Sequence, residues 1–266
     1  MKFIVCIKQV PDTMEVKIDP KTKRIVREGI PSIINPYDTY ALEEGIRLKE
    51  RFQGESIAIT MGPPQADASL RECIAMGIDS VILLSDRAFA GSDTLATSYT
   101  LSQAIRKISD VSLVICGREA LDGSTGQVGP EIAEFLGFPI ITYVKEILNI
   151  ANGFVECVRL MEDHYETLKS PLPAVITVIK EINEPRLASL KGLLKSKKAN
   201  IPLWTKNDLG GEDKSYGQDG SPTKVADIWA HEIKKEVKII QHDEPEQSAE
   251  EILNQIKDWG FAIKWK

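Results

Sequence analysis

The sequence has few of the residues from which enzymes most often build catalytic centres. Only three histidines occur in 266 residues, and none is spaced from another histidine or a cysteine as metal ligands usually are. His231 opens the run His-Glu-Ile-Lys-Lys, which fails the zinc pattern H-E-x-x-H at its last position. The serine-nucleophile motif G-x-S-x-G is absent, and we interpret His164 as a solvated turn residue. The sequence therefore predicts no catalytic side chain and no metal site.

The chain also lacks paired cysteines, a membrane-length apolar run and an excess of positive charge. Cys6, Cys73, Cys116 and Cys157 form no C-x-x-C pair, and we interpret them as reduced core residues of a cytoplasmic protein. No basic leader precedes the apolar run that starts at Lys2, so we expect neither export nor a membrane. With 39 acidic against 33 basic side chains the formal net charge is -6, which argues against an extended nucleic-acid surface.

Apolar runs of strand length recur through the first half of the chain. They cover residues 3–7, 56–61, 80–84, 113–116 and 140–144. Between them, helical patterns begin at Asn35-Pro36 and at Ser92-Asp93-Thr94, and a third ends at Gly77. Continuous apolar strands, each followed by a helix, predict an α/β fold with a mostly parallel, doubly wound sheet. We expect the nucleotide-binding, adenine nucleotide α-hydrolase-like form of this fold.

After residue 145 the pattern changes. Residues 154–161 and 165–169 predict a β-hairpin added to the sheet, and residues 174–182 predict a buried strand. Residues 201–225 carry turn residues without periodicity, so we expect an extended C-terminal arm without secondary structure there. Ser248-Ala-Glu-Glu251 is a capping box that predicts a terminal helix. We therefore divide the chain into an α/β domain, residues 1–190, and an arm with a terminal helix, residues 191–266.

The most informative segment is Asp122-Gly-Ser-Thr-Gly-Gln-Val-Gly-Pro130. Its three glycines permit positive φ and close backbone approach, and Pro130 suits only a first helical turn, so a helix begins inside the segment. Unpartnered N–H groups at such a helix start, with the hydroxyls of Ser124 and Thr125, favour a phosphate. A turn that binds nothing is the alternative. Neither the G-x-G-x-x-G fingerprint nor the P-loop lysine is present, so we expect binding by backbone and hydroxyl groups.

Ligands of parallel sheets bind at the carboxyl ends of the strands. This rule gathers the segments after the predicted strands at one edge, together with the helix start at residues 35–38. Two helix N-termini, at Thr94 and near Thr125, then point into one crevice, which is what a diphosphate requires. Because acid–base residues are missing, we infer that a bound cofactor carries the chemistry, although a noncatalytic binding subunit would have the same sequence pattern.

Four segments together resemble the β subunit of electron transfer flavoprotein, over almost the whole chain. They are Lys8-Gln-Val-Pro-Asp12, Asn35-Pro36 with Glu43-Glu44, Asp122 to Pro130, and Asn183-Glu-Pro-Arg-Leu-Ala-Ser-Leu190. A fifth stretch, residues 159–173, follows the signature of that family. The resemblance implies a heterodimer whose α subunit holds one FAD, while the β-subunit crevice holds AMP or, in the electron-bifurcating class, a second FAD.

The resemblance, joined to the sheet-edge rule, predicts the residues that line the cofactor crevice. They are Cys6, Asn35, Pro36, Tyr37, Asp38, Met61, Asp93, Thr94, Thr97, Gly117, Asp122, Gly123, Ser124, Thr125, Gly126, Gln127, Val128, Gly129 and Pro130. Leu190 matches the leucine that the family inserts into a hydrophobic pocket of a partner dehydrogenase. The tail beyond Ile201 matches an arm that embraces the α subunit.

The choice between AMP and FAD depends on residues 91–97, which resemble the bifurcating class. AMP has one phosphate and needs one helix N-terminus, whereas the pyrophosphate of FAD gains from a second, supplied by Asp93, Thr94 and Thr97. The simpler interpretation is that Ser92 and Asp93 only cap a helix. We expect FAD, with AMP in a plain electron carrier as the alternative.

The resemblance further implies that NADH gives a hydride to this FAD, with one electron passing to ferredoxin and the other through the α-subunit FAD to the dehydrogenase. Two other classes stay open. A nucleotide-using enzyme predicts ATP turnover by the isolated chain, but the loop lacks a lysine or a metal-binding acid for it. The other class is a regulatory module that binds a nucleotide and associates with itself. In such a protein the arm and Leu190 would have no role.

Overall fold

The computed structural model describes residues 1–12, 31–226 and 237–261. His231, which entered the metal-site prediction, lies outside these residues. The described residues up to 226 belong to one compact unit, and residues 237–261 belong to a second. The predicted α/β domain, residues 1–190, lies within the first unit, and the described residues of the predicted arm, residues 191–266, are shared between the two units.

The first unit contains all the strands that the structure describes. They are β1 Lys2–Ile7, β2 Gln9–Pro11, β3 Ser32–Ile34, β4 Glu55–Met61, β5 Ser80–Leu84, β6 Val111–Gly117, β7 Ile140–Ala151, β8 Phe154–Leu160, β9 Tyr165–Pro171, β10 Ala174–Val178 and β11 Leu203–Trp204. Its α-helices are α1 Pro36–Phe52, α2 Asp67–Met76, α3 Thr94–Lys107, α4 Val128–Leu136, α5 Leu190–Lys198 and α6 Lys206–Leu209. Short 3-10 turns lie at Pro64–Ala66, Arg87–Phe89, Lys180–Ile182 and Asp213–Ser215.

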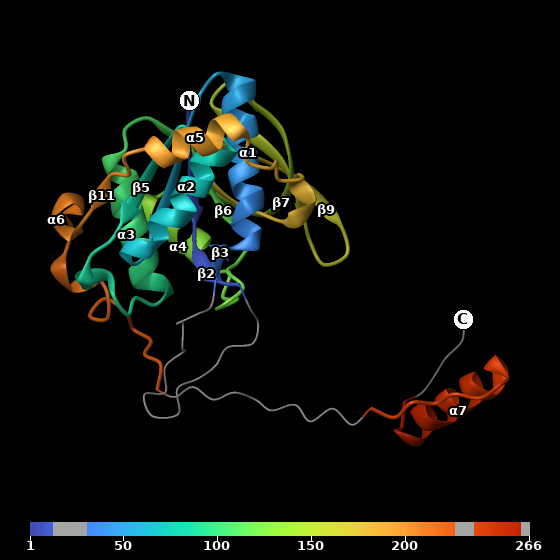
Figure 1. Cartoon of the computed structure of the whole chain (residues 1–266). Helices are drawn as coiled ribbons and strands as arrows, with labels where there is room; N and C mark the ends of the chain where they lie inside the picture. Colours follow the sequence, from blue (N-terminus) through green and yellow to red (C-terminus); the bar gives the residue numbers. More distant parts are fainter. Residues whose placement is uncertain (13–30, 227–236, 262–266) are drawn as a thin grey trace. The chain divides into compact units, whose positions relative to one another are not determined.

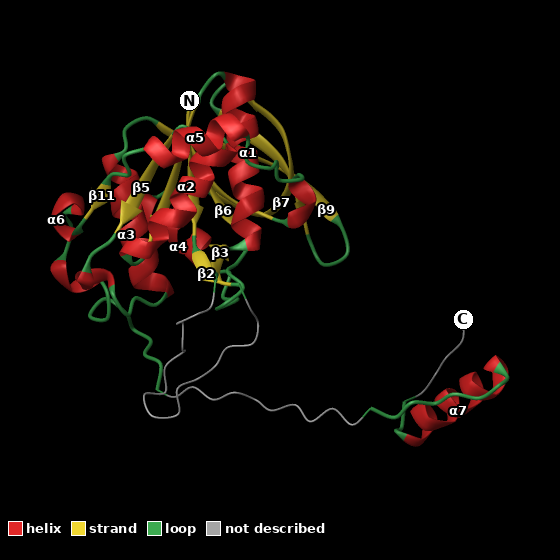
Figure 2. Ribbon diagram, viewed as in Figure 1, coloured by secondary structure: helices red, strands yellow, loops and turns green. Residues whose placement is uncertain are grey.

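Nine of the described strands form one mixed sheet, in the order β11-β5-β4-β1-β6-β10-β7-β8-β9 (Figure 2). The pairs from β11 to β7 are parallel, while β7, β8 and β9 form the predicted antiparallel addition. The inner strands β5, β4, β1, β6 and β10 are buried over most of their length because helices cover both faces. The α/β, mostly parallel and doubly wound fold that the sequence predicts is confirmed.

Each face of the sheet has its own hydrophobic core. Helices α1 and α2 cover one face of the sheet (Figure 1). Leu42 and Ile46 of α1 pack there against β1 and β6, and Leu70 of α2 belongs to the same core beside β4 and β5. On the other face, Leu101 of α3 and Ile132 of α4 pack against β4 and β6. These residues recur at helical spacing, so each helix presents one apolar stripe to the sheet.

The helix boundaries follow ordinary capping chemistry. Pro36 is the first residue of α1, and Gly77, with φ +133°, ends α2 as the sequence predicts. The carboxylate of Asp93 accepts a hydrogen bond from the N–H of Ala96 (3.1 Å) and so caps α3. Strand β10 ends at Val178, four residues earlier than predicted, and a 3-10 turn follows it.

The prediction that residues 201–225 lack secondary structure is wrong. Strand β11 pairs in parallel with β5, and α6 follows it directly. The buried ring of Tyr216 lies against Phe89 and Tyr99, with centroids 5.6 and 5.1 Å apart. A two-residue strand and a four-residue helix are too short to give a periodic sequence signal, and single anchors such as Tyr216 carry the packing.

The second unit contains helix α7, Pro245–Asp258. The predicted terminal helix is therefore confirmed. Its N-cap is Glu244, however, and the capping box predicted at Ser248 is wrong, because the helix already begins at Pro245. Pro245 supplies the start because its φ suits a first helical turn. The Ser248 hydroxyl instead accepts a hydrogen bond from the N–H of His242 (3.0 Å). No helix within the described ranges is long and apolar enough to span a membrane.

Candidate functional site: a crevice at the β1/β6 switch point

The strand order reverses between β1 and β6. From β1 the chain runs to β4 and then β5 on one side, and it crosses back to form β6 on the other. The helices that follow β1 and β6 thus leave on different faces. The carboxyl ends of these two strands are therefore the switch point, which is where doubly wound sheets form their ligand crevice. The sequence predicts the edge of the sheet but not this position within it.

Two cysteines stand directly below the crevice. Cys6 and Cys116 are register partners on β1 and β6 and are both buried. A hydrogen bond with Cys6, together with burial, raises the pKa of Cys116 well above its ordinary value. All four cysteines of the chain are free, buried thiols, as the sequence predicts. Both side chains therefore pack the floor of the crevice, and Cys116 stays a neutral thiol.

A hydrogen-bonded junction ties the start of α1 to the crevice. The amide of Lys8 donates to the carboxylate of Asp38 (2.7 Å). The fully buried side chain of Asn35 donates to the carbonyl of Glu119 (2.8 Å) and accepts from the N–H of Leu121 (3.1 Å). One asparagine thus fixes the entry to the glycine-rich loop against the start of α1. Beside it, the Lys8 ammonium pairs with Asp122 (2.6 Å).

The glycine-rich loop is open to solvent over residues 121–125 and leads into α4 at Val128, so the predicted helix start is confirmed. Ser124 and Gly126 adopt positive φ values of 49° and 63°. Within the described part of the chain, the N–H groups of Thr125, Gly126, Val128 and Gly129 donate to no acceptor. Four amides at one helix start are therefore available to an anion.

The second helix start lies directly beside the first. The Thr94 hydroxyl is 3.1 Å from the side-chain oxygen of Gln127 and 3.1 Å from a carboxylate oxygen of Glu131. Ser98 bonds the other oxygen of Glu131 at 3.0 Å, so α3 and α4 are joined at their first turns. Over residues 31–226, the N–H groups of Thr94 and Leu95 also donate to no acceptor.

The predicted crevice residues fall into three groups in the structure. Those from β1, the start of α1, the end of β6 and the glycine-rich loop lie around the hydrogen-bonded junction of Asn35 and Asp38. Thr94 and Thr97 lie in the first turn of α3, while both carboxylate oxygens of Asp93 already accept hydrogen bonds, from Ala96 and from Thr223. Met61 ends β4 at the same edge of the sheet. Leu190 lies elsewhere: it begins α5, and the adjoining amide of Ser189 bonds Ala75 near the end of α2.

Sequence reasoning missed an arginine between two tyrosines at this edge. The Arg118 guanidinium lies 5.3 Å from the ring centroid of Tyr37 and 5.7 Å from that of Tyr143. It pairs with Glu119 at 2.7 Å, and its buried Nε has no partner among the described residues. Tyr143 holds a φ of +57°, which is unusual for a bulky residue and occurs where the β7 register shifts. No local sequence pattern reports a positive φ at a tyrosine.

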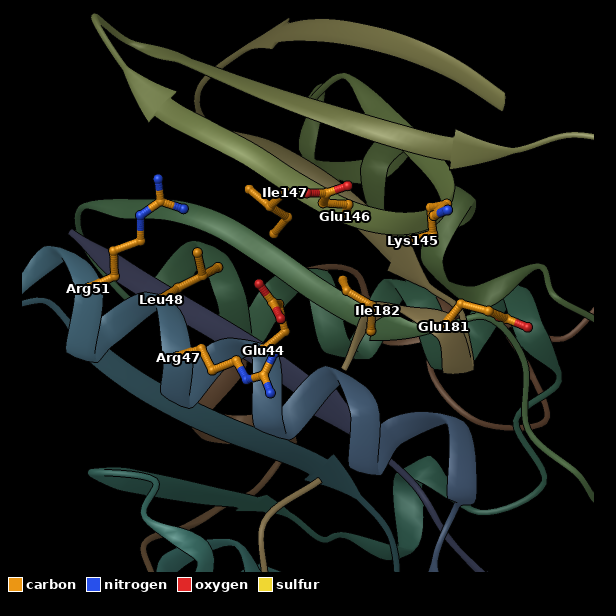
Figure 3. Close-up of a pocket in the computed structure, with 9 residues that line it drawn as sticks. All are labelled: Glu44, Arg47, Leu48, Arg51, Lys145, Glu146, Ile147, Glu181 and Ile182. Carbon is orange, nitrogen blue, oxygen red and sulfur yellow. The ribbon is translucent and has the colours of Figure 1, made fainter. Parts of the chain in front are cut away.

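A groove of about 440 Å³ lies away from the crevice, between α1, β7 and the 3-10 turn at 180–182 (Figure 3). Charged side chains of both signs line it, and Leu48, Ile147 and Ile182 form its apolar part. Burial raises the pKa of Glu44 in its wall, against a hydrogen bond from Asn183. None of the predicted crevice residues lines this groove. Among the described residues, no cluster of acidic, histidine or cysteine side chains is placed to hold a metal ion.

Asp38 makes the free energy of unfolding depend on pH. Burial raises the pKa of Asp38 to about 7, against hydrogen bonds from Asn35, Lys8 and Gly117 that lower it. Between its ordinary 3.8 and about 7, the folded chain keeps a proton that the unfolded chain releases. The contribution of Asp38 to stability is therefore present at low pH and declines as the pH rises through this window.

We expect Asp38→Asn to flatten this part of the pH profile, because an amide does not titrate. Urea unfolding of wild type and variant at several values between pH 4 and pH 8 measures the two slopes. A wild-type profile that loses no more stability than the variant over this range would contradict the assignment.

A doubly wound parallel sheet with a glycine-rich helix start at its switch point defines an α/β protein of the nucleotide-binding type. A family model described as "Electron transfer flavoprotein domain" matches residues 22–209. The chain belongs to the electron transfer flavoprotein family, as a β subunit.

Individual relatives agree with this assignment. The chain is 49% identical over 226 residues to "Caffeyl-CoA reductase-Etf complex subunit CarD" of Acetobacterium woodii. This match covers 85% of this chain and 86% of the relative. It is 42% identical over 259 residues to "Electron transfer flavoprotein subunit beta" of Clostridium acetobutylicum, a match that covers 97% of this chain and 98% of the relative. "Protein FixA" of Azotobacter vinelandii is 42% identical over 262 residues, with 95% and 93% covered.

Proposed function

We propose that this β subunit binds FAD in the switch-point crevice and serves an electron-bifurcating electron transfer flavoprotein. In this proposal it pairs with an α subunit that holds a second FAD, takes electrons from NADH, and delivers them to ferredoxin and to a flavin-dependent dehydrogenase. When bound, the isoalloxazine supplies the redox chemistry by accepting a hydride and releasing single electrons. The chain itself binds, orients and shields that group.

The observation that carries the proposal is the junction of two helix starts. Among the described residues, the amides of Thr94 and Leu95 at the start of α3 have no acceptor, and neither do the four amides named above at the start of α4. Side-chain hydrogen bonds hold these two helix starts together. Each helix start carries a partial positive charge and fits one phosphoryl group. A pyrophosphate uses both starts, whereas the single phosphate of AMP leaves one of them without a ligand. FAD therefore fits the donor set better than AMP.

The acidic groups around the crevice are compatible with an anion because each already has protein partners. Asp122 is paired with Lys8, and Glu131 accepts from Thr94 and Ser98. Hydrogen bonds from Thr223 and Ala96 outweigh burial and keep the pKa of Asp93 below its ordinary value. These pairings reduce the repulsion that bare carboxylates would exert on a diphosphate.

The relatives' names support the assembly in this proposal. The Acetobacterium protein is named as a subunit of a reductase-Etf complex, which supports a dehydrogenase-type partner here. Leu190 and Leu187 are 76% and 93% exposed at the start of α5, so an apolar contact with that partner is available. We assign the C-terminal arm and α7 to the α subunit, since Ile252 and Trp259 remain exposed in the described second unit.

Two glycine variants test the cofactor assignment on the heterodimer. Gly126→Ala places a side chain at a φ of +63° within the phosphate loop, whereas Gly137→Ala does the same at +70° at the other end of α4. Each substitution introduces about 1 to 2 kcal/mol of backbone strain, so we expect the two variants to have similar free energies of unfolding. We expect Gly126→Ala to lose the β-subunit FAD and the bleaching of flavin absorbance by NADH, and Gly137→Ala to keep both. Equal FAD content and equal NADH reduction in the two variants would contradict the site.

A further inference from the structure

The segment from Tyr216 to Thr223 reaches the capping residue of α3. The Thr223 N–H and hydroxyl both donate to one carboxylate oxygen of Asp93, at 3.0 and 2.7 Å. The Ser221 hydroxyl accepts a hydrogen bond from the Asp93 N–H at 2.8 Å and donates to the carbonyl of Gly217 at 2.7 Å. The other Asp93 oxygen caps α3 through the N–H of Ala96. The Asp93 carbonyl accepts from the N–H of Thr97 at 3.0 Å. Every polar group of Asp93 is thus bonded to this segment or to α3.

The segment is itself firmly seated on the α/β unit. Tyr216 is buried between Phe89 and Tyr99, and Gly217 lies so close to the carbonyl of Ala88 that a Cβ would collide with it. Gly217 also holds a φ of +59°, which a larger residue adopts only with strain. A buried aromatic anchor and a close-packed glycine fix the path of the chain just before it reaches Asp93.

An N-cap needs only one carboxylate oxygen, and Asp93 Oδ1 already serves α3. The three further hydrogen bonds, from Thr223 and to Ser221, are not required for capping. The two bonds from Thr223 fix the orientation of the carboxylate, and the bond to Ser221 fixes the backbone of Asp93. Together they hold the first turn of α3, whose Thr94 hydroxyl contacts Gln127 at the start of α4. After residue 226, the last described residue of the first unit, the chain continues as the part of the C-terminal arm that carries α7.

We propose that Ser221 and Thr223 form a clasp that holds the first turn of α3 in its anion-binding position and couples it to the attachment of the C-terminal arm. The inference rests on the proposed function, since it assigns positioning residues to that crevice. Attachment of the arm to the α subunit restrains the clasp, the clasp restrains Asp93, and the Thr94 and Leu95 amides stay directed at the diphosphate. Cofactor binding and subunit assembly then favour one another.

Thr223→Val tests the clasp, with Thr205→Val as the matched control. Thr205 makes the same kind of hydroxyl–carboxylate bond, to Asp208 at 2.7 Å, in the same C-terminal stretch. It lies near the C-terminal end of α3, where Lys107 donates to the Asp208 carbonyl, and not at the first turn of that helix. FAD and AMP are titrated separately into the heterodimer freed of nucleotide. Because a hydrogen bond to a charged group is lost, we expect Thr223→Val to weaken FAD binding at the β site roughly tenfold. Thr205→Val should change it less than about twofold.

Amide hydrogen exchange at Ala96 and Thr97 supplies a readout that a purely structural role would not move. In the wild type, addition of the α subunit to the full chain should slow exchange at these amides. In Thr223→Val and in the second variant, Ser221→Ala, that additional protection should disappear, while Thr205→Val should keep it. Wild-type FAD affinity together with wild-type protection in both clasp variants would overturn the clasp. A wild-type heterodimer that binds neither FAD nor AMP in the β subunit would instead overturn the proposed function.

Discussion

Replacing Arg186 by methionine should lower the free energy of unfolding by about 3 kcal/mol, because it leaves a buried carboxylate without its main partner. Arg186 forms two hydrogen bonds to Glu43 through its guanidinium (2.9 and 3.1 Å), and its backbone N–H adds a third (3.1 Å). Glu43 is only 3% exposed at its side chain. Burial alone raises the pKa of Glu43, yet the bonds from Arg186 and Arg47 hold it below its ordinary value.

Arg47→Met is the matched control for Arg186→Met. Arg47 reaches the same carboxylate at 3.0 Å, but it is one helical turn away on α1 and about half exposed, so its loss should cost only about 0.5 kcal/mol. Chemical unfolding of the two variants measures both effects. Equal losses of stability would mean that the Arg186 pair contributes no more than a surface contact.

Arg186→Met should also weaken the docking of a dehydrogenase. Arg186 bridges Glu43 and Glu50 of α1 and so anchors the loop that leads to Leu190. We propose Leu190 as the contact with the dehydrogenase, and once the loop is released this residue must be ordered again on binding, which costs affinity. We expect a higher KM for the partner dehydrogenase, with the FAD content of the heterodimer unchanged. An unchanged KM would show that the loop needs no anchor.

Gly117→Ala should have the second large effect, on both stability and the crevice. A Cβ at this position would collide with the Asp38 carboxylate and would lie 2.8 Å from the carbonyl carbon of Tyr37. Backbone atoms at the start of α1 cannot move aside as a flexible side chain would, so we expect a loss of about 3 kcal/mol. The displaced α1 should disturb the Asn35 junction and reduce the amount of nucleotide bound.

Gly123→Ala is the control for Gly117→Ala. A Cβ on Gly123 meets nothing within 4 Å, so the unfolding free energy should change by less than about 0.5 kcal/mol. If the loop receives a phosphate at close range, nucleotide binding by this variant should still fall. Chemical unfolding of both variants measures the effect on packing, and nucleotide titration measures the effect on ligand binding. Comparable destabilisation by the two substitutions would contradict the packing described for Gly117.

The sequence allows prediction of those elements whose pattern is local and long enough. The buried parallel strands appear as continuous apolar runs, and α1, α2 and α3 carry clear start or stop residues. The structure of residues 190–226 is harder to predict, because α5 is a lysine-rich helix capped by Ser189 and β11 has only two residues. Their positions depend on tertiary contacts with α2 and β5, which no local pattern encodes.

The candidate crevice was predictable to a similar degree. Glycine spacing and the edge rule are local and topological, so the loop and the two helix starts follow from the sequence. The partners of Asp93 do not, because Ser221 and Thr223 lie about 130 residues further along the chain. The stacking of Arg118 against Tyr37 and Tyr143 likewise joins three separate elements. Such contacts are fixed only once the sheet order is known.

The most direct test of the central claim is a count of the nucleotides in the purified heterodimer. The protein is denatured, FAD is measured by its absorbance, and adenine nucleotides are separated and identified. The junction of the α3 and α4 helix starts predicts two FAD per heterodimer and no AMP. One FAD accompanied by one AMP, or one FAD alone, would contradict the claim that a diphosphate occupies both helix starts.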